Sequence, residues 1–171
     1  MRVVPSKPSI RFLILVALLG AGSLISPIER VRAQSAGPFA GLSGSWTGGG
    51  SIRLSSGAVE RLTCRANYVP GGGGDTLEQN LRCASQSYNF KLQIDLANNG
   101  GAILGSWNEL TRRVQGGISG HGSKGLIQAT VRGQAFSADV TVVTRGAQQS
   151  VNIRAPSGDL AMVSIDLHRG R

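Results

Sequence analysis

The sequence predicts an all-β protein, an antiparallel up-and-down meander of about 8–10 strands that closes into a small soluble barrel behind a signal peptide. From Leu42 onward, apolar and polar residues alternate with a period of two, which is typical of half-buried strands. Clusters rich in Gly, Asn and Ser separate these runs at hairpin spacing. No window has the period of an amphipathic helix. We favour a barrel over a sandwich because closure removes the exposed strand edges.

The N-terminal segment has the order of features found in a secretory signal peptide. Arg2, Lys7 and Arg11 precede residues 12–25, which are apolar and uncharged, and small or apolar side chains then lead up to Ala33. We expect cleavage after Ala33 and a periplasmic or secreted mature protein. The alternative is an uncleaved anchor, but the apolar stretch is shorter than the roughly 20 residues that a spanning helix needs.

Residues 1–33 are therefore expected to be removed, leaving a short lead at 34–41 and a single barrel domain at 42–169. Five of the 18 basic residues and one of the nine acidic residues lie in the signal, so the mature net charge is +5 rather than +9. No basic run exceeds Arg112-Arg113, which argues against nucleic-acid binding. The eight aromatic residues are too few for the two aromatic girdles of an outer-membrane barrel.

Ten segments carry the strand pattern, and the clearest of them is 87–96, where aromatic and aliphatic residues alternate with polar ones. Between the segments lie turn signals such as 71–75, 98–101 and 156–159. The expected strands are 42–54, 58–68, 76–84, 87–96, 102–109, 112–120, 125–132, 135–144, 148–155 and 160–168.

Cys64 and Cys83 are expected to form a disulfide. Both lie on the apolar face of their strands, and the glycine turn at 71–74 is almost midway between them, so a hairpin there places them opposite one another. The same register opposes Arg65 and Arg82, which carries a modest like-charge cost. We accept this cost because a bridge that closes a loop of about 20 residues is worth roughly 3 kcal/mol.

Little in the chain indicates catalysis or metal binding, and we expect no enzyme activity and no cofactor. His121 and His168 both alternate to the polar side of their strands, and no zinc-ligand spacing is present. Ser119 lies near His121 but lacks the strand–turn–helix context of a nucleophile elbow. Glu109 shares a face with Trp107 at a strand end, which suggests a rim carboxylate.

Six aromatic residues fall on the apolar face and are the candidate lining of an interior pocket. Several glycines share this inward phase, among them Gly48, Gly50 and Gly105. They either leave room for a ligand or permit close packing of the strands, and we favour close packing. The candidate lining residues are Trp46, Tyr68, Tyr88, Phe90, Trp107 and Phe136.

Gly44-Ser45-Trp46, at the start of the first strand, resembles the GxW signature of the lipocalins. This resemblance implies that the tryptophan closes one end of the barrel beneath an arginine from the last strands, either Arg154 or Arg169. The glycine spacing from Gly44 to Gly50 is also similar to that of nitrobindin-type barrels, which implies haem binding through a C-terminal histidine. His168 is the candidate for that role, but its outward phase argues against it.

From 39 to 169 the chain as a whole resembles a group of small exported alphaproteobacterial proteins, and this implies a barrel. Two functions remain open. The first is a binding module that holds a small apolar ligand inside the barrel. The second is an envelope interaction protein with a filled interior, which contacts an anionic envelope surface through outward arginines. These arginines are Arg53, Arg61, Arg65, Arg82 and Arg154.

Overall fold

The computed structural model describes residues 36–156 and 158–170 as ten strands and one short 3-10 turn. All ten predicted strands are confirmed. The predicted signal peptide lies outside the described residues, and within them no helix is long and apolar enough to cross a membrane. The elements are β1 (Gly44–Leu54), β2 (Val59–Gly71), η1 (Gly72–Gly74), β3 (Thr76–Ala84), β4 (Asn89–Asn99), β5 (Ala102–Glu109), β6 (Val114–Ser123), β7 (Leu126–Arg132), β8 (Ser137–Arg145), β9 (Gln148–Arg154) and β10 (Leu160–Arg169).

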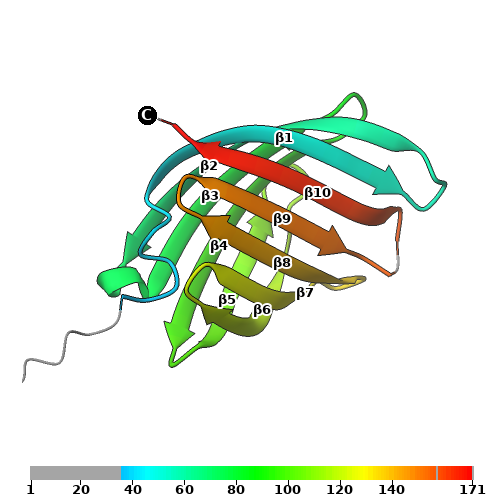
Figure 1. The fold of residues 1–171 in the computed structure, drawn as a ribbon. Helices are drawn as coiled ribbons and strands as arrows, with labels where there is room; N and C mark the ends of the chain where they lie inside the picture. The colour runs from blue at the N-terminus through cyan, green and yellow to red at the C-terminus, as the bar shows by residue number, and fades with distance from the viewer. Residues whose placement is uncertain (1–35, 157, 171) are drawn as a thin grey trace, which may run out of the picture. The chain divides into compact units, whose positions relative to one another are not determined.

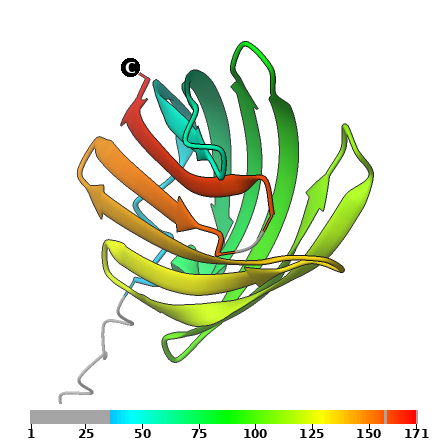
Figure 2. The ribbon, with the colours of Figure 1, turned by 90° about the vertical axis from the view of Figure 1, so that its right-hand side faces the viewer.

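The strands form one antiparallel meander that closes on itself, as predicted. Each strand pairs with its neighbours in sequence, and β1 also pairs with β10 from Trp46–Arg169 to Leu54–Leu160. Figure 1 shows this order, and Figure 2 shows the sheet curling round until β10, in red, lies beside β1. Because the barrel is closed, every one of its strands has a hydrogen-bonded neighbour on both sides.

Several strands run further than their sequence signals suggest. The segment 98–101 was expected to be a turn, but β4 continues through Asn99 and only Gly100 and Gly101 make the turn. Their φ angles of 58° and 96° lie in the left-handed region, where glycine is favoured and which two-residue hairpin loops use. The pairing therefore continues to the last residue before the turn, although that residue is polar.

The predicted disulfide and its register are both confirmed. Cys64 in β2 pairs directly with Cys83 in β3 and is bonded to it, with the two Cα atoms 4.2 Å apart. Arg65 stands opposite Arg82 in the next pair, as expected. The two sulfurs belong to the buried core, where Cys64 is 1% exposed and Cys83 is 5% exposed.

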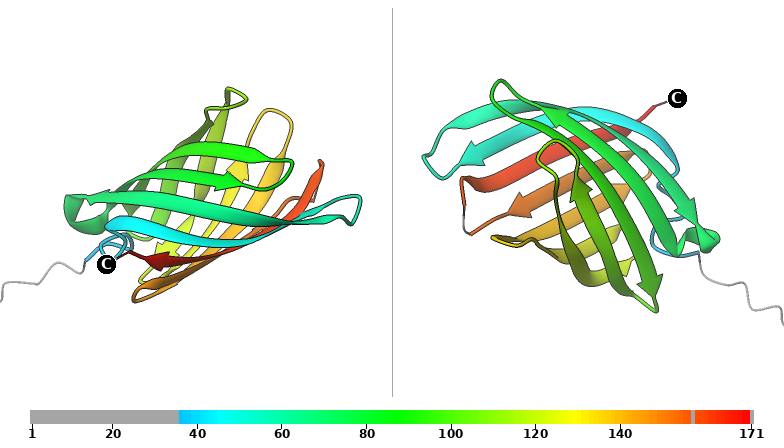
Figure 3. Two further views of the ribbon diagram at one scale, coloured as in Figure 1. Left: turned by 90° about the horizontal axis from the view of Figure 1, so that it is seen from above. Right: turned by 180° about the vertical axis from the view of Figure 1, so that it is seen from behind.

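One end of the barrel is closed by the segment 36–43, which folds across it beside η1 (Figure 3). The Phe39 amide donates a hydrogen bond to the carbonyl oxygen of Gly74, and the Phe39 side chain is fully buried. The indole Nε1 of Trp46 donates to the carbonyl oxygen of Leu42 over 2.9 Å. The residues expected to form a lead are therefore the plug of the barrel from Ala36 onward.

Arg169 lies over this plug. Its guanidinium group is centred 4.8 Å from the Trp46 ring, within the range of a cation–π interaction, and it donates a hydrogen bond to the carbonyl oxygen of Gly41. Arg154 lies at the end of β9, opposite Met162 and Asp139. Of the two candidates from the lipocalin resemblance, Arg169 is the one that covers the tryptophan.

The inward glycines of β1 permit close packing. A Cβ atom at Gly48 or Gly50 would overlap the carbonyl oxygens of Asp166 and Ser164 in β10. Alanine at either position would therefore force β1 and β10 apart at the seam where the barrel closes. This agrees with close strand approach as the reason for glycine here.

Replacing both cysteines by alanine is expected to lower the free energy of unfolding by about 2–4 kcal/mol, because the bridge restricts the unfolded chain across a loop with a sequence separation of 19 residues. Chemical denaturation, followed by tryptophan fluorescence with and without reductant, measures this. Reductant should move the midpoint of the wild type but not that of the variant. Equal midpoints for oxidised and reduced wild type would show that the bridge does not stabilise the fold.

Candidate ligand-binding cavity

The barrel encloses a cavity of about 510 Å³. This volume is within the range of roughly 300–1,000 Å³ that is typical of small-molecule sites. Strict alternation along β3 and β4 directs leucine, isoleucine and phenylalanine side chains inward, and these line the cavity together with inward residues of β7 to β10. The interior is therefore hollow and largely apolar.

The cavity is closed at the plugged end and open at the other. Its floor is formed by Leu42, Tyr68 and Leu77, all less than 5% exposed. The lining residues Phe136 and Met162, near the opposite end, are each 38% exposed. A ligand would enter between the hairpin loops at this open end.

Most of the predicted aromatic residues line this space. Tyr68 lies at the floor, whereas Tyr88, Phe90, Trp107 and Phe136 lie towards the rim. The rim aromatics form two pairs, Tyr88 with Phe90 at 5.9 Å between ring centroids and Trp107 with Phe136 at 5.4 Å. Aromatic rings at these separations attract one another beyond their burial of area.

Trp46 differs from the expectation that it lines the pocket. Its side chain is fully buried among the plug residues and lies outside the cavity lining. The ring of Tyr68 packs edge-on against it at 5.9 Å, so Tyr68 separates Trp46 from the cavity. The Trp46 side chain does point inward, as the alternating pattern of its strand predicts. At the plugged end, however, an inward side chain packs against the plug and does not face open space.

Polar side chains at the floor form a directed chain of hydrogen bonds. Gln79 Nε2 donates to Tyr68 Oη over 3.3 Å, and the Tyr68 hydroxyl donates to Gln149 Oε1 over 2.5 Å. Gln149 Nε2 then donates to Thr144 Oγ1 over 3.1 Å. Burial raises the pKa of Tyr68 well above its usual value, against the hydrogen bond to Gln149, so the phenol stays neutral.

The two glutamines of this chain were not recognised as site residues from the sequence. A signal was available, because Gln79 stands at an inward position between Leu77 and Leu81, and Gln149 precedes the inward Val151. A polar residue at an apolar phase needs a partner inside the barrel.

At the rim, Glu109 holds the loop between β5 and β6. Its Oε1 accepts hydrogen bonds from the backbone amides of Lys91 and Thr111, and its Oε2 accepts one from Arg112 over 2.6 Å. Burial works to raise the pKa of Glu109, but the amide hydrogen bonds of Lys91, Arg112 and Thr111 together hold it below its usual range. Glu109 is 4% exposed, and its carboxylate is used to hold the loop.

Glu60 has a matching role in the neighbouring loop. Its Oε2 accepts hydrogen bonds from the Ser85 hydroxyl and the Ser87 amide. The Ser85 hydroxyl oxygen in turn accepts a hydrogen bond from the Tyr88 backbone amide. Glu60 and Glu109 are thus both engaged in fixing hairpin loops at the open end.

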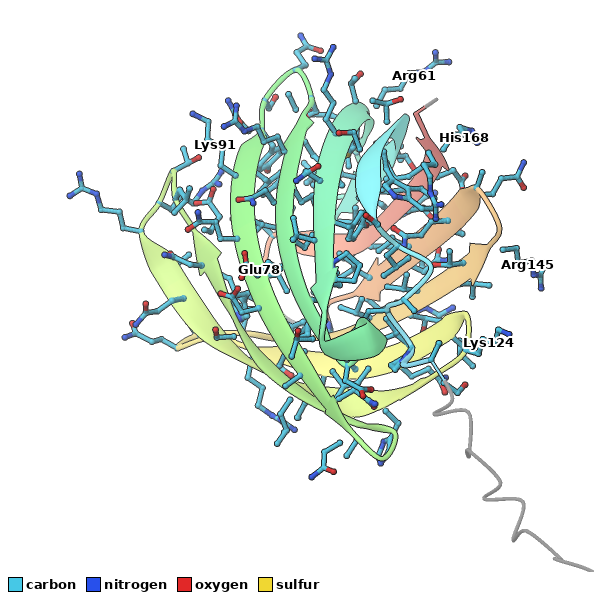
Figure 4. The ribbon with its side chains drawn as sticks, turned by 90° about the vertical axis from the view of Figure 1, so that its left-hand side faces the viewer. Arg61, Glu78, Lys91, Lys124, Arg145 and His168 are labelled. Carbon is cyan, nitrogen blue, oxygen red and sulfur yellow. A yellow bond between two sulfur atoms is a disulfide. The ribbon has the colours of Figure 1, made fainter. Side chains whose placement is uncertain are left out.

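The two histidines lie on the outer surface. His121 in β6 and His168 in β10 are exposed, and Figure 4 shows His168 projecting outward. In the part of the chain that the structure describes, no group of three or more His, Cys, Asp or Glu side chains could hold a metal ion. The residues present do not fit a haem inside the barrel ligated by His168, because that side chain points away from the cavity.

Comparison with known proteins supports the fold. No family model and no curated protein matches the sequence, so the expected likeness to exported alphaproteobacterial proteins finds no support there. Among solved structures, Rv2717c from M. tuberculosis is similar, with a TM-score of 0.59 and 14% identity over 77% of this chain and 94% of that chain. The S-type phycobiliprotein lyase CPES from Guillardia theta is similar with a TM-score of 0.54 and 9% identity, over 78% of this chain and 90% of that one. At these identities the likeness shows the fold, which fits a lipocalin-like barrel.

Substituting Glu109→Gln is expected to lower the free energy of unfolding at pH 7 by about 1–3 kcal/mol, because the amide side chain cannot accept all three backbone hydrogen bonds. Since the folded pKa of Glu109 lies below the ordinary value of 4.5, the ionised group stabilises the fold above that value and loses this effect as the pH falls below it. Wild type and variant should therefore converge in stability as the pH falls from about 5 towards 3.

Denaturation midpoints measured across this pH range provide the test, with Glu78→Gln as the control because Glu78 is exposed on the outer face. Parallel stability curves for wild type and Glu109→Gln would contradict the role assigned to Glu109.

Proposed function

We propose that this protein is an exported binding protein that holds a small apolar ligand inside its barrel. The observation that carries the proposal is the cavity of about 510 Å³, which is lined by apolar side chains and open at one end. A filled interior, as the envelope-protein hypothesis requires, would leave no such space. Burial of apolar ligand surface contributes about 25 cal/mol per Å², which is enough to drive binding in a preformed site.

The hydrogen bonds of the two glutamates at the open end favour binding over catalysis. One structural neighbour is a phycobiliprotein lyase, but Glu60 and Glu109 are occupied with loop amides and hydroxyls here. A general acid or base needs a free position against its substrate. The disulfide supports an oxidising compartment, the periplasm or the exterior.

Native mass spectrometry of protein purified from the periplasm tests the proposal directly. We expect a co-purifying small molecule in stoichiometric amount, and we expect the delipidated protein to bind an apolar fluorescent dye. Bare protein that binds no apolar dye would contradict the proposed function.

Filling part of the cavity should weaken this binding. Leu92 in β4 faces the interior, and Leu104 in β5 is 63% exposed on the outer face. We expect Leu92→Trp to weaken dye binding by about tenfold or more, because the indole occupies ligand volume, and Leu104→Trp to leave binding unchanged. Fluorescence titration of both variants measures this, and equal losses in both would place the dye outside the barrel.

A second function is favoured by a separate observation on the outer surface. Arg65 in β2 pairs with Arg82 in β3, which pairs with Lys91 in β4, so three exposed cations stand side by side across the sheet. Among the described residues none of the three has an ion-pair partner. Like charges placed opposite one another destabilise a sheet, so a counter-charge from outside would relieve the row.

We infer that this cationic row, Arg65, Arg82 and Lys91, contacts an anionic envelope surface. Figure 4 shows Lys91 projecting outward from this face. Each cation near an anionic lipid surface contributes about 1 kcal/mol. This contact and ligand binding use different faces of the barrel and are compatible.

Replacing all three cations of the row by serine is expected to weaken binding to phosphatidylglycerol vesicles by about 100-fold. The control replaces Lys124, Arg132 and Arg145, which are exposed elsewhere and carry the same total charge. Vesicle co-sedimentation at low salt should show a much smaller loss for the control. Equal losses would assign the binding to net charge alone, and absence of binding by the wild type would remove this second function.

A further inference from the structure

The polar chain at the floor indicates which end of a ligand lies deepest. We propose that the cavity takes an apolar ligand with one uncharged hydrogen-bonding end, such as a hydroxyl or primary amide, and that Gln79 binds this end near the plug. This inference rests on the proposed function and specifies the chemistry of its ligand.

Of the two glutamines in the chain, Gln79 offers more hydrogen-bonding capacity to the cavity, because Gln149 is 3% exposed and already both accepts from Tyr68 and donates to Thr144. The Tyr68 hydroxyl proton goes to Gln149, and a proton of the Gln149 amide goes to Thr144. Gln79 uses one N–H on Tyr68, which leaves its second N–H and its carbonyl oxygen without a hydrogen bond to any other described residue. Because Gln79 is half-buried and lines the cavity, both free groups are accessible from the cavity.

The chain also orients the free groups. Each donor in the series is directed towards the next acceptor, so the Gln79 amide has a defined donor side and acceptor side. Bonds in such a chain polarise one another and resist reorganisation. A hydroxyl or primary amide satisfies both sides, since it donates to the carbonyl oxygen and accepts from the N–H.

The same part of the cavity argues against a charged ligand end. The Asp, Glu, Lys, Arg and His side chains that line the cavity are Glu109, Arg112 and Asp159, and all three lie on or beside the loops of the open end. The guanidinium group of Arg112 stacks over Phe90 at 5.2 Å and lies 3.8 Å from Glu109. A carboxylate carried to the floor would lose its hydration without gaining a cation, which is costly.

Four ligands of one chain length separate these cases: 1-decanol, decanamide, decane, and decanoate at pH 8. Each is titrated against a bound apolar dye, with wild type and with Gln79→Leu. We expect Gln79→Leu to weaken decanol and decanamide by about tenfold and to leave decane unchanged or slightly tighter. We expect decanoate to bind at least about tenfold more weakly than decanol to the wild type.

The matched control is Gln93→Leu, the same substitution on the outer face of β4. It should change no affinity. A direct observation on the wild type avoids any effect of the variant on folding: the side-chain amide resonances of Gln79 should shift on addition of decanol and stay nearly unchanged with decane.

The possible outcomes distinguish failure of this inference from failure of the proposed ligand-binding function. If decanol and decane respond equally to Gln79→Leu, or if decanoate is the preferred ligand, the inference is overturned while ligand binding stands. If none of the four ligands displaces the dye and no dye binds, the proposed function itself fails.

Discussion

The pairing of the first strand with the last, from Trp46–Arg169 to Leu54–Leu160, converts a flat meander into a ring, and every other property of the interior depends on it. The seam needs glycine at positions 48 and 50, where a Cβ atom would overlap the backbone of β10. Once the ring is closed, alternate side chains along each strand point into the barrel interior or out towards the surface. Without the seam, the same apolar face would be exposed to water.

The plug gives this ring its direction. Phe39, Leu42 and Trp46 close one end, and Arg169 from the last strand lies over the indole ring. The cation is therefore attached to the seam itself, and the plug and the closure stabilise one another. At the opposite end, Glu60 and Glu109 fix the loops that join β3 to β4 and β5 to β6.

Strand positions and the disulfide could be predicted from the sequence because both depend on local order. A period of two, turn residues between the runs and a glycine turn midway between Cys64 and Cys83 determine the hairpin register. The choice between Arg154 and Arg169 could not be made, since it depends on which end of the barrel the plug covers.

The cavity itself could not be predicted from the sequence either. Whether inward side chains fill a barrel depends on their total volume relative to the volume that the barrel encloses. Trp46 also shows that an inward-pointing residue can either line the cavity or pack against the plug. For Gln79, the inward position between two leucines could be predicted from the sequence. Its membership of the hydrogen-bonded chain could not, because that depends on its contact with Tyr68.

The central claim is that an apolar ligand occupies the inside of the ring. Intermolecular NOEs between 1-decanol and methyl-labelled protein test this most directly. The account predicts contacts to the methyl groups of Ile94, Val140 and Val151, which line the cavity, and none to Leu104 or Leu126 on the outer face. Contacts confined to the outer-face methyl groups would contradict it.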